Sequence, residues 1–223
     1  MNLNRLELLI GSENIDKIKK LNILVLGLGG VGGYAVESLI RCGVEHITLV
    51  DGDMIKSSNL NRQIISTSRN INRYKTREFK KRIKSINRNA VVNIVNTFIN
   101  EKNMYLLFME DYDYIVDACD TVKVKILLMK ECLNRKIKLI SSMGTANKLE
   151  ASKLEITTLN KTSYDPLAKK IRKEFSESES KKIHVIASTE TVKNKEGLGS
   201  ICYVPATAGL LITNYIINDV LKK

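Results

Sequence analysis

The sequence predicts an α/β protein with a Rossmann-like, mostly parallel sheet, helices on both faces, and antiparallel strands added by the C-terminal third. Two observations predict it. Short apolar runs alternate with helical patterns through the first 145 residues, and a glycine-rich turn follows the first of these runs. With 223 residues, of which 43% are hydrophobic, the chain is long enough to bury one core of full size.

The first unit is a strand, a glycine turn and a helix. Residues 22–26 (NILVL) form a continuous apolar run, which is typical of a strand buried on both faces of a parallel sheet. The turn GLGGVG occupies residues 27–32, and a helix is expected from about Val31 through Ile40. Glycines let the backbone approach a phosphate, and the helix N-terminus favours an anion there. A packing turn without a ligand is the alternative.

The second strand, residues 47–50, ends at Asp51, where a carboxylate can reach a ribose hydroxyl. Thr121 is the expected N-cap of a helix that runs through Leu133. Ligands bind beyond the carboxyl ends of parallel strands, so the glycine turn, Asp51 and Asp120 should surround one crevice. A carboxylate beside phosphates favours a bridging metal ion, which makes Asp120 a candidate magnesium ligand. The other elements expected in this part are strands at 91–95, 114–117 and 137–141 and a short helix at 104–109.

After Ser141 the pattern changes. Strands are expected at 153–159 and 182–187, with a basic helix that starts at Asp165-Pro166 between them. The polar run 177–182 is expected to be a mobile loop, and an apolar helix should close the chain at 206–221. The prediction is one domain, 1–223, in three parts: an N-terminal helical segment (1–21), a nucleotide-binding core (22–145), and C-terminal strands, crossover loop and final helix (146–223).

Basic residues outnumber acidic ones by 36 to 24, a net charge of +12, and their excess is concentrated. Between Arg69 and Arg88 there are nine Lys or Arg residues and one acid, Glu78. Read as a helix, this segment has an apolar face and an opposite basic stripe: Arg73, Arg77, Lys80, Lys81, Lys84 and Arg88. The stripe is either a solvated helix surface or a contact surface for a phosphate backbone. A second, shorter basic cluster occupies residues 169–173.

Targeting signals and cysteine spacing indicate a cytoplasmic protein without a membrane segment. No apolar run approaches the roughly 18 residues that a membrane span needs, and residues 1–5 do not open a signal peptide. Four scattered cysteines without a C-x-x-C pair make a structural zinc site or a disulfide unexpected. They are interpreted as core or interface residues, with a nucleophilic role for Cys202 as the alternative.

The motifs taken together resemble a known family. In order along the chain they are the glycine turn at 27–32, Asp51-x-Asp53, Ser58-Asn59-x-x-Arg62-Gln63, Lys75 and Asp117-x-x-Asp120. Over residues 5–145 this set is similar to the ubiquitin-activating-enzyme-like (E1-like) adenylating superfamily. Within it, the rest of the chain resembles the tRNA threonylcarbamoyladenosine dehydratases. The motifs that carry this second resemblance include Thr162-x-x-Asp165-Pro166-Leu167-Ala168, Ser188-x-Glu190, and Gly199-Ser200 followed by Val204-Pro205.

The resemblance implies ATP and Mg²⁺ as cofactors and assigns roles by position. The catalytic residues would be Arg62, Lys75, Asp120 and Arg5, with Asp120 also holding the metal and Arg5 reaching the partner's site in a homodimer. Relatives often carry Asn where this chain has Thr121, whose hydroxyl can still donate a hydrogen bond. The implied ATP-binding residues are Gly27, Gly29, Gly30, Gly32, Asp51, Asp53, Ser58, Asn59, Gln63 and Thr121.

The implied activity is ATP-dependent cyclisation of threonylcarbamoyladenosine in tRNA, by adenylation of the threonyl carboxylate followed by ring closure. The implied partners are tRNA carrying this modification, a second copy of the chain, and a sulfur-transfer protein. Three alternatives stay open. They are an activator of the C-terminal glycine of a ubiquitin-like sulfur carrier, an NAD-dependent dehydrogenase, and a non-catalytic RNA-binding or scaffold protein with a vestigial pocket.

Overall fold

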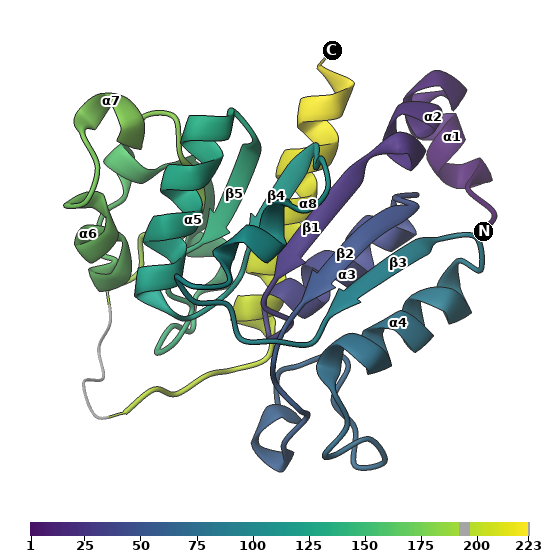
Figure 1. Cartoon of the computed structure of the whole chain (residues 1–223), viewed down its shortest axis with the longest axis horizontal. Coiled ribbons are helices and arrows are strands. Elements are labelled where there is room, and N and C mark those ends of the chain that lie inside the picture. The colour runs from purple at the N-terminus through teal and green to yellow at the C-terminus, as the bar shows by residue number, and fades with distance from the viewer. Residues whose placement is uncertain (192–196, 223) are drawn as a thin grey trace.

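The computed structural model describes residues 1–191 and 197–222 and contains a seven-stranded sheet in the order β3-β2-β1-β4-β5-β7-β6 (Figure 1). Every neighbouring pair is parallel except β6 and β7. The predicted α/β fold with an antiparallel extension is therefore confirmed. The strands are β1 (Asn22–Leu26), β2 (His46–Val50), β3 (Val91–Val95), β4 (Tyr114–Asp117), β5 (Lys138–Ser142), β6 (Leu154–Thr158) and β7 (His184–Ser188).

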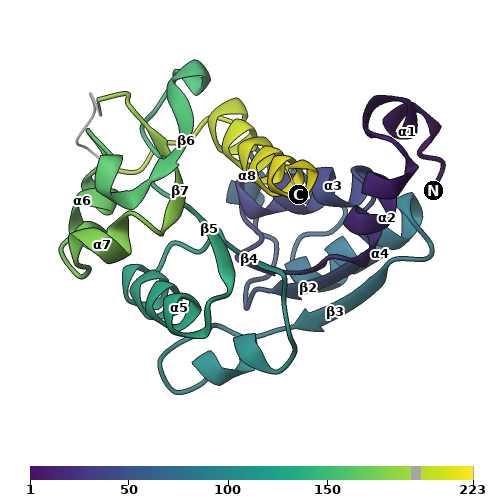
Figure 2. The same ribbon diagram turned by 90° about the horizontal axis from the view of Figure 1, so that it is seen from above.

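Helices cover both faces of the sheet, as Figure 2 shows from above. One face packs against α2 (Ser12–Lys20), α3 (Gly32–Arg41), α4 (Lys75–Ile86) and α8 (Tyr203–Leu221). The other face packs against α5 (Val122–Arg135), the 3₁₀ segment Met104–Phe108 and α6 (Pro166–Arg172). The two short helices α1 (Asn4–Ile10) and α7 (Glu177–Ser180) lie at opposite ends of the molecule (Figure 1).

Helix α8 begins at Tyr203, three residues before the expected start, and has 19 residues. Contrary to the sequence expectation, it is long and apolar enough to cross a membrane by length and composition alone. Half of its most apolar stretch is buried, and it packs along α3 with side chains such as Ile212 and Ile216 in the core. A core helix of a folded domain passes the same test, so no membrane protein is indicated.

One local expectation was wrong, and another was confirmed in position but not in its capping hydrogen bond. Residues 177–182 are not a mobile loop, because residues 177–180 form α7. Ser176 caps this helix and Glu179 bonds back to the Ser176 backbone, a reciprocal capping box that closes a short turn. Thr121 does occupy the N-cap position of α5, but its side chain makes no capping hydrogen bond. Its hydroxyl instead lies 3.4 Å from Oδ1 of Asp120.

Candidate active site

A pocket of about 650 Å³ lies beyond the carboxyl ends of β1, β2, β4 and β5, a volume typical of small-molecule sites. Two of the predicted site residues are not in its lining. Gly32 is buried as the first residue of α3, and Arg5 lies in a separate surface depression with Arg41. The predicted residues that do line the pocket are Gly27, Gly29, Gly30, Asp51, Asp53, Ser58, Asn59, Arg62, Gln63, Lys75, Asp120 and Thr121.

The glycine turn is packed too closely for side chains at its ends. Gly27 has φ +89°, and a Cβ there would lie 2.7 Å from the carbonyl oxygen of Ala118. A Cβ on Gly32 would lie 1.9 Å from the carbonyl oxygen of Gly27. The turn, the start of α3 and the segment after β4 therefore meet backbone to backbone. This contact leaves Gly29 and Gly30 on the pocket wall, next to the N-terminus of α3.

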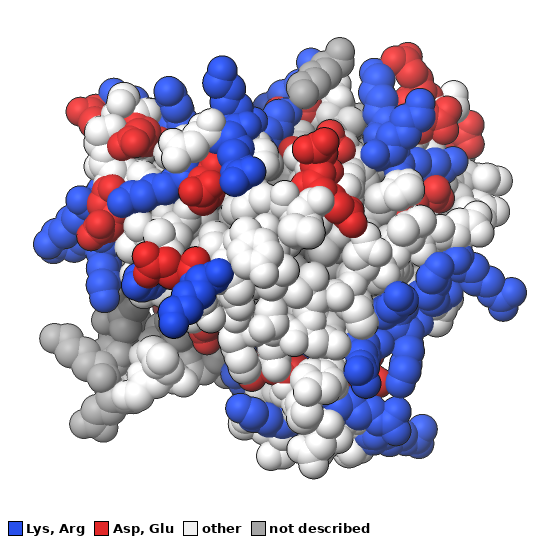
Figure 3. Space-filling view, in the orientation of Figure 1, with Lys and Arg blue, Asp and Glu red and all other residues white. Residues whose placement is uncertain are grey.

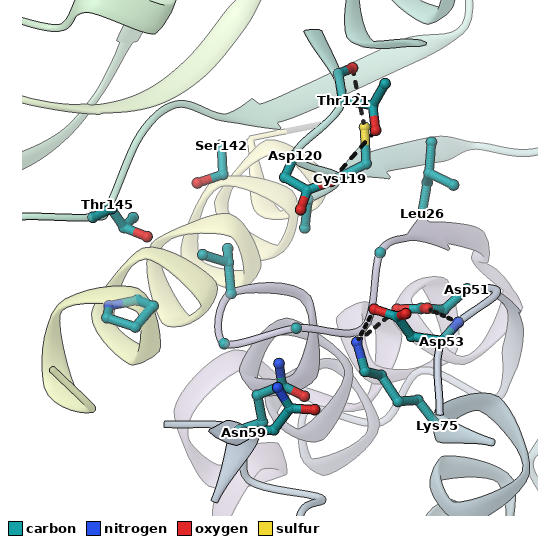
Figure 4. Close-up of a pocket in the computed structure, with 18 of the residues that line it drawn as sticks. Leu26, Asp51, Asp53, Asn59, Lys75, Cys119, Asp120, Thr121, Ser142 and Thr145 are labelled. Atoms are coloured by element: carbon teal, nitrogen blue, oxygen red, sulfur yellow. Dashed lines mark hydrogen bonds and ion pairs between the residues drawn. The ribbon is translucent and has the colours of Figure 1, made fainter. Parts of the chain in front are cut away.

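Two aspartates and a lysine form the floor of the pocket, and Figure 4 shows Lys75 pointing toward Asp51 and Asp53. The Lys75 Nζ lies 2.9 Å from Oδ2 of Asp53 and 3.6 Å from Oδ2 of Asp51, and Lys75 is only 4% exposed. The Asp51 carboxylate accepts hydrogen bonds from the backbone N–H groups of Leu28 and Asp53, each at 2.7 Å. Asp51 thus ties the glycine turn to the end of β2 and holds the buried ammonium group in place.

The segment after β2 supplies the polar groups of a second wall. A 3₁₀ turn, Ser57–Asn59, buries Asn59, whose Oδ1 accepts from the backbone N–H of Lys56 at 3.0 Å. The Arg62 guanidinium donates to the carbonyl oxygen of Ser58 at 2.8 Å and to Oδ1 of Asn61 at 2.9 Å. The loop therefore fixes the direction of its own arginine before any ligand enters.

The opposite wall carries Cys119, Asp120 and Thr121 (Figure 4). Burial raises the pKa of the Cys119 thiol well above its usual range, so the thiol stays protonated at neutral pH. Asp120 is exposed at the pocket edge. Within residues 1–191 and 197–222, no group of three or more His, Cys, Asp or Glu converges on one point. A magnesium ion that is bound mainly through nucleotide phosphates needs only one or two protein carboxylates, and Asp120 can supply one of them. The described residues do not offer the larger ligand set of a metal site made only of protein groups.

A buried network that sequence reasoning missed forms part of the pocket wall, because its Lys125 and Ser142 line the pocket. Lys125 is 1% exposed, and its Nζ lies 3.0 Å from Asp117, 3.2 Å from Oγ of Ser141 and 2.9 Å from the carbonyl oxygen of Ser142. The Ser141 hydroxyl also donates to Asp117 at 2.6 Å. This network joins the ends of β4 and β5 to α5. A lysine among the buried positions of an amphipathic helix was the one available signal.

A second unforeseen group orders residues 143–146, which line the pocket. The buried Asp165 carboxylate caps α6 through the backbone N–H of Ala168, at 3.0 Å. It also accepts from the backbone N–H of Gly144 at 3.2 Å and from Nζ of Lys148 at 3.3 Å. The helix start expected at Asp165-Pro166 is confirmed, and the same carboxylate anchors the pocket wall.

The model of the ThiF family matches residues 2–222. The chain belongs to the ThiF family. A tRNA threonylcarbamoyladenosine dehydratase of Bacillus subtilis is 38% identical to it over 98% of this chain and 94% of the relative. This ThiF-family chain is also similar to two crystal structures of the Escherichia coli dehydratase at 29% identity. The complex with ATP has a TM-score of 0.94 (99% of this chain, 93% of the other), and the complex with AMP has 0.93 (98% and 93%). The E1-like resemblance read from the motifs is therefore confirmed.

Proposed function

We propose that this ThiF-family protein uses ATP to cyclise threonylcarbamoyladenosine in tRNA. The observation that carries the proposal is one pocket lined by the glycine turn, Arg62, Lys75 and Asp120 together. The crystallised E. coli relative, similar over nearly its whole length, binds ATP and AMP. A dinucleotide pocket for hydride transfer would leave Arg62, Lys75 and Asp120 without a task, which argues against the NAD-dependent alternative.

The chemistry begins with a carboxylate, which is a poor acylating agent because its leaving group would be oxide. The threonyl carboxylate oxygen bonds to the α-phosphorus of ATP, and the bond from that phosphorus to pyrophosphate breaks. The product is an acyl adenylate. A nitrogen of the same modification then bonds to the activated carbonyl carbon, and AMP and a proton leave. The nucleophile belongs to the substrate, so the enzyme needs no thioester, in agreement with the raised pKa of the Cys119 thiol.

The chain's own residues supply position and charge. The glycine turn and the start of α3 offer backbone N–H groups to phosphate oxygens. Asp51 can accept from ribose hydroxyls with the lone pairs that its two backbone hydrogen bonds leave free. Arg62 and Lys75 offset the negative charge that builds at the α-phosphorus. Asp120 would hold Mg²⁺, which when bound neutralises phosphate charge and orients the leaving pyrophosphate.

Assembly and location complete the proposal. Arg5 lies in a depression apart from the pocket of its own chain, which supports a homodimer in which Arg5 reaches the partner's site. Helix α1 exposes Leu8 (89%) and Leu9 (79%) beside it, as expected of a surface that another chain covers. A cytoplasmic location agrees with a tRNA substrate. A sulfur-transfer protein partner and the three-part division of the domain stay predictions of the sequence.

The test is mass spectrometry of anticodon-loop nucleosides after incubation of purified protein, ATP, Mg²⁺ and tRNA carrying threonylcarbamoyladenosine. The expected product is one water lighter than the substrate nucleoside, and it requires ATP. An Arg62→Ala variant should lower the rate by roughly 10³-fold or more, by analogy with arginines in phosphoryl transfer. ATP–pyrophosphate exchange driven by a ubiquitin-like carrier protein, with no change in the tRNA, would reject the proposal in favour of the carrier-activating alternative.

A further inference from the structure

Helix α4 carries a row of exposed cations that the adenylation chemistry does not use. The buried side of the helix includes Phe79 and Ile83, which pack in the core. The exposed side continues at both ends into the adjoining loops, and Figure 3 shows the basic side chains gathered over α4 at the lower right of the molecule. The basic face of α4 comprises Arg69, Arg73, Arg77, Lys80, Lys81, Lys84 and Arg88, all of them exposed.

Little of this charge is neutralised within the chain. Glu78, with a side chain 12% exposed, is the one acid in the segment, and it lies 2.7 Å from Lys81 and 3.9 Å from Arg73. Across the part of the chain that the structure describes, no ion pair involves Lys80 or Lys84. Lys84 donates a hydrogen bond to the carbonyl oxygen of Arg88, at 3.1 Å.

Arg82 is also on α4, but its ion pair with Glu37 gives it a structural role that Lys80 and Lys84 lack. Its guanidinium bonds both oxygens of Glu37, at 2.6 and 2.9 Å, and so clamps α4 to α3. Arg41 bonds the same carboxylate at 2.8 Å. Where the fold needs a cation on α4, it therefore provides a buried carboxylate to receive it. Within the described residues the basic face has one carboxylate partner, Glu78, for its seven cations, and a row of like charges costs stability unless something outside the chain compensates it.

The basic face is continuous with the pocket. Helix α4 starts at Lys75, which lies in the pocket, and its 12 residues extend about 18 Å away from it. The loop between β2 and α4 supplies Lys56 and Arg62 to the pocket before it carries Arg69 and Arg73. A nucleotide whose base modification reaches the reacting phosphorus would thus have its flanking phosphates next to the start of this row.

The composition of the basic face of α4 indicates which class of partner it can bind. No large hydrophobic side chain is exposed among residues 69–88, so the surface offers charge without an apolar anchor for a membrane or an amphipathic peptide. One helical turn advances about 5.4 Å, so cations three and four residues apart form a row that can follow successive phosphates. Folded RNA is recognised largely through its phosphates and 2′-hydroxyl groups, which such a row can contact.

We propose that the basic face of α4 holds the phosphate backbone of the tRNA whose modified adenosine occupies the pocket. This inference rests on the proposed function for its choice of RNA. It assigns the binding energy of the macromolecular substrate to α4, apart from the pocket residues that act on ATP.

The test is a triple variant, Lys80→Gln, Lys81→Gln and Lys84→Gln, matched by Lys17→Gln, Lys19→Gln and Lys20→Gln. The control lysines belong to α2, which ends just before β1 begins. They therefore lie near the amino ends of the strands, at the opposite end of the sheet from the pocket. Fluorescence anisotropy measures binding of tRNA carrying threonylcarbamoyladenosine at several salt concentrations. The α4 variant should bind at least tenfold more weakly at low salt, and its log–log salt slope should be shallower by about 2 to 3. ATP affinity should stay unchanged, and the α2 control should bind tRNA like the parent protein.

An α4 variant with the parent protein's affinity and slope overturns the proposal, as does an equal loss in the α2 control, which would indicate a net-charge effect. If the triple variant does not fold, the pair Lys80→Gln and Lys84→Gln leaves the Lys81–Glu78 contact intact and answers the same question. Failure of the proposed function is seen separately. A parent protein that forms no cyclic product yet binds tRNA through α4 refutes the cyclisation and keeps the surface.

Discussion

Replacing Lys125 with methionine tests the buried network in the pocket wall. The side chains have similar length, so the change removes the ammonium group and keeps most of the packing. In the folded chain that group contacts Asp117, Ser141 and the Ser142 carbonyl, and Asp117 is fully buried. Asp117 also accepts from the backbone N–H of Cys119 at 3.2 Å, so it orders the segment that leads to Asp120.

The expected cost follows from the burial of both partners. Without Lys125, the Asp117 carboxylate keeps its hydroxyl and amide donors but loses its counter-charge, and breaking a buried pair in this way costs about 3–5 kcal/mol. A domain of this kind has roughly 5–15 kcal/mol of stability, so the single change should remove at least about a fifth of it. The double variant Asp117→Asn, Lys125→Met buries no charge and should recover about 2 kcal/mol or more of the loss.

Urea unfolding followed by circular dichroism measures these differences, with ATP affinity as the second readout. We expect weaker ATP binding in the single variant, because the end of β4 carries the wall with Asp120. A single variant within about 1 kcal/mol of the parent protein would refute the reasoning, since an ordinary solvated ion pair costs no more than that. Equal losses in the single and double variants would also refute it.

Two further predictions concern other parts of the chain. Cys119→Ser should leave cyclisation unchanged, because burial raises the pKa of the thiol; lost turnover with normal ATP binding would instead indicate a covalent role. Burial by itself raises the pKa of Glu37, but hydrogen bonds from Arg82 and Arg41 hold it below its ordinary value of 4.5. Glu37→Gln should therefore cost roughly 1–3 kcal/mol at pH 7, a difference that shrinks as pH falls below 4.5. Unfolding curves that differ equally at pH 7 and pH 3.5 would contradict this.

Several features of the fold could be predicted because they depend on neighbours in the chain. Apolar runs of strand length, a glycine turn before a helical pattern, and a basic stripe opposite Phe79 and Ile83 are all local patterns, and the structure confirms them. The carboxyl-end rule for parallel sheets then brought the glycine turn and Asp51 into one pocket with Asp120. The capping box at Ser176 and Glu179 is also a local sequence pattern, but the polar composition of residues 177–182 favoured the prediction of a loop.

The sequence by itself thus determined the order and type of the strands and of the longer helices, the polar groups available to a nucleotide, and the excess of charge on α4. Only the tertiary structure decided that β7 lies between β5 and β6, that Lys125 pairs with Asp117 and Ser141, and that Lys75 lies between two aspartates. It alone separates Arg82, held by Glu37, from Lys80 and Lys84 of the same helix, which form no ion pair within the described residues. The physical reason is that periodicity reports which side of an element is buried, whereas the partner of a buried charge comes from a distant segment that meets it only after packing.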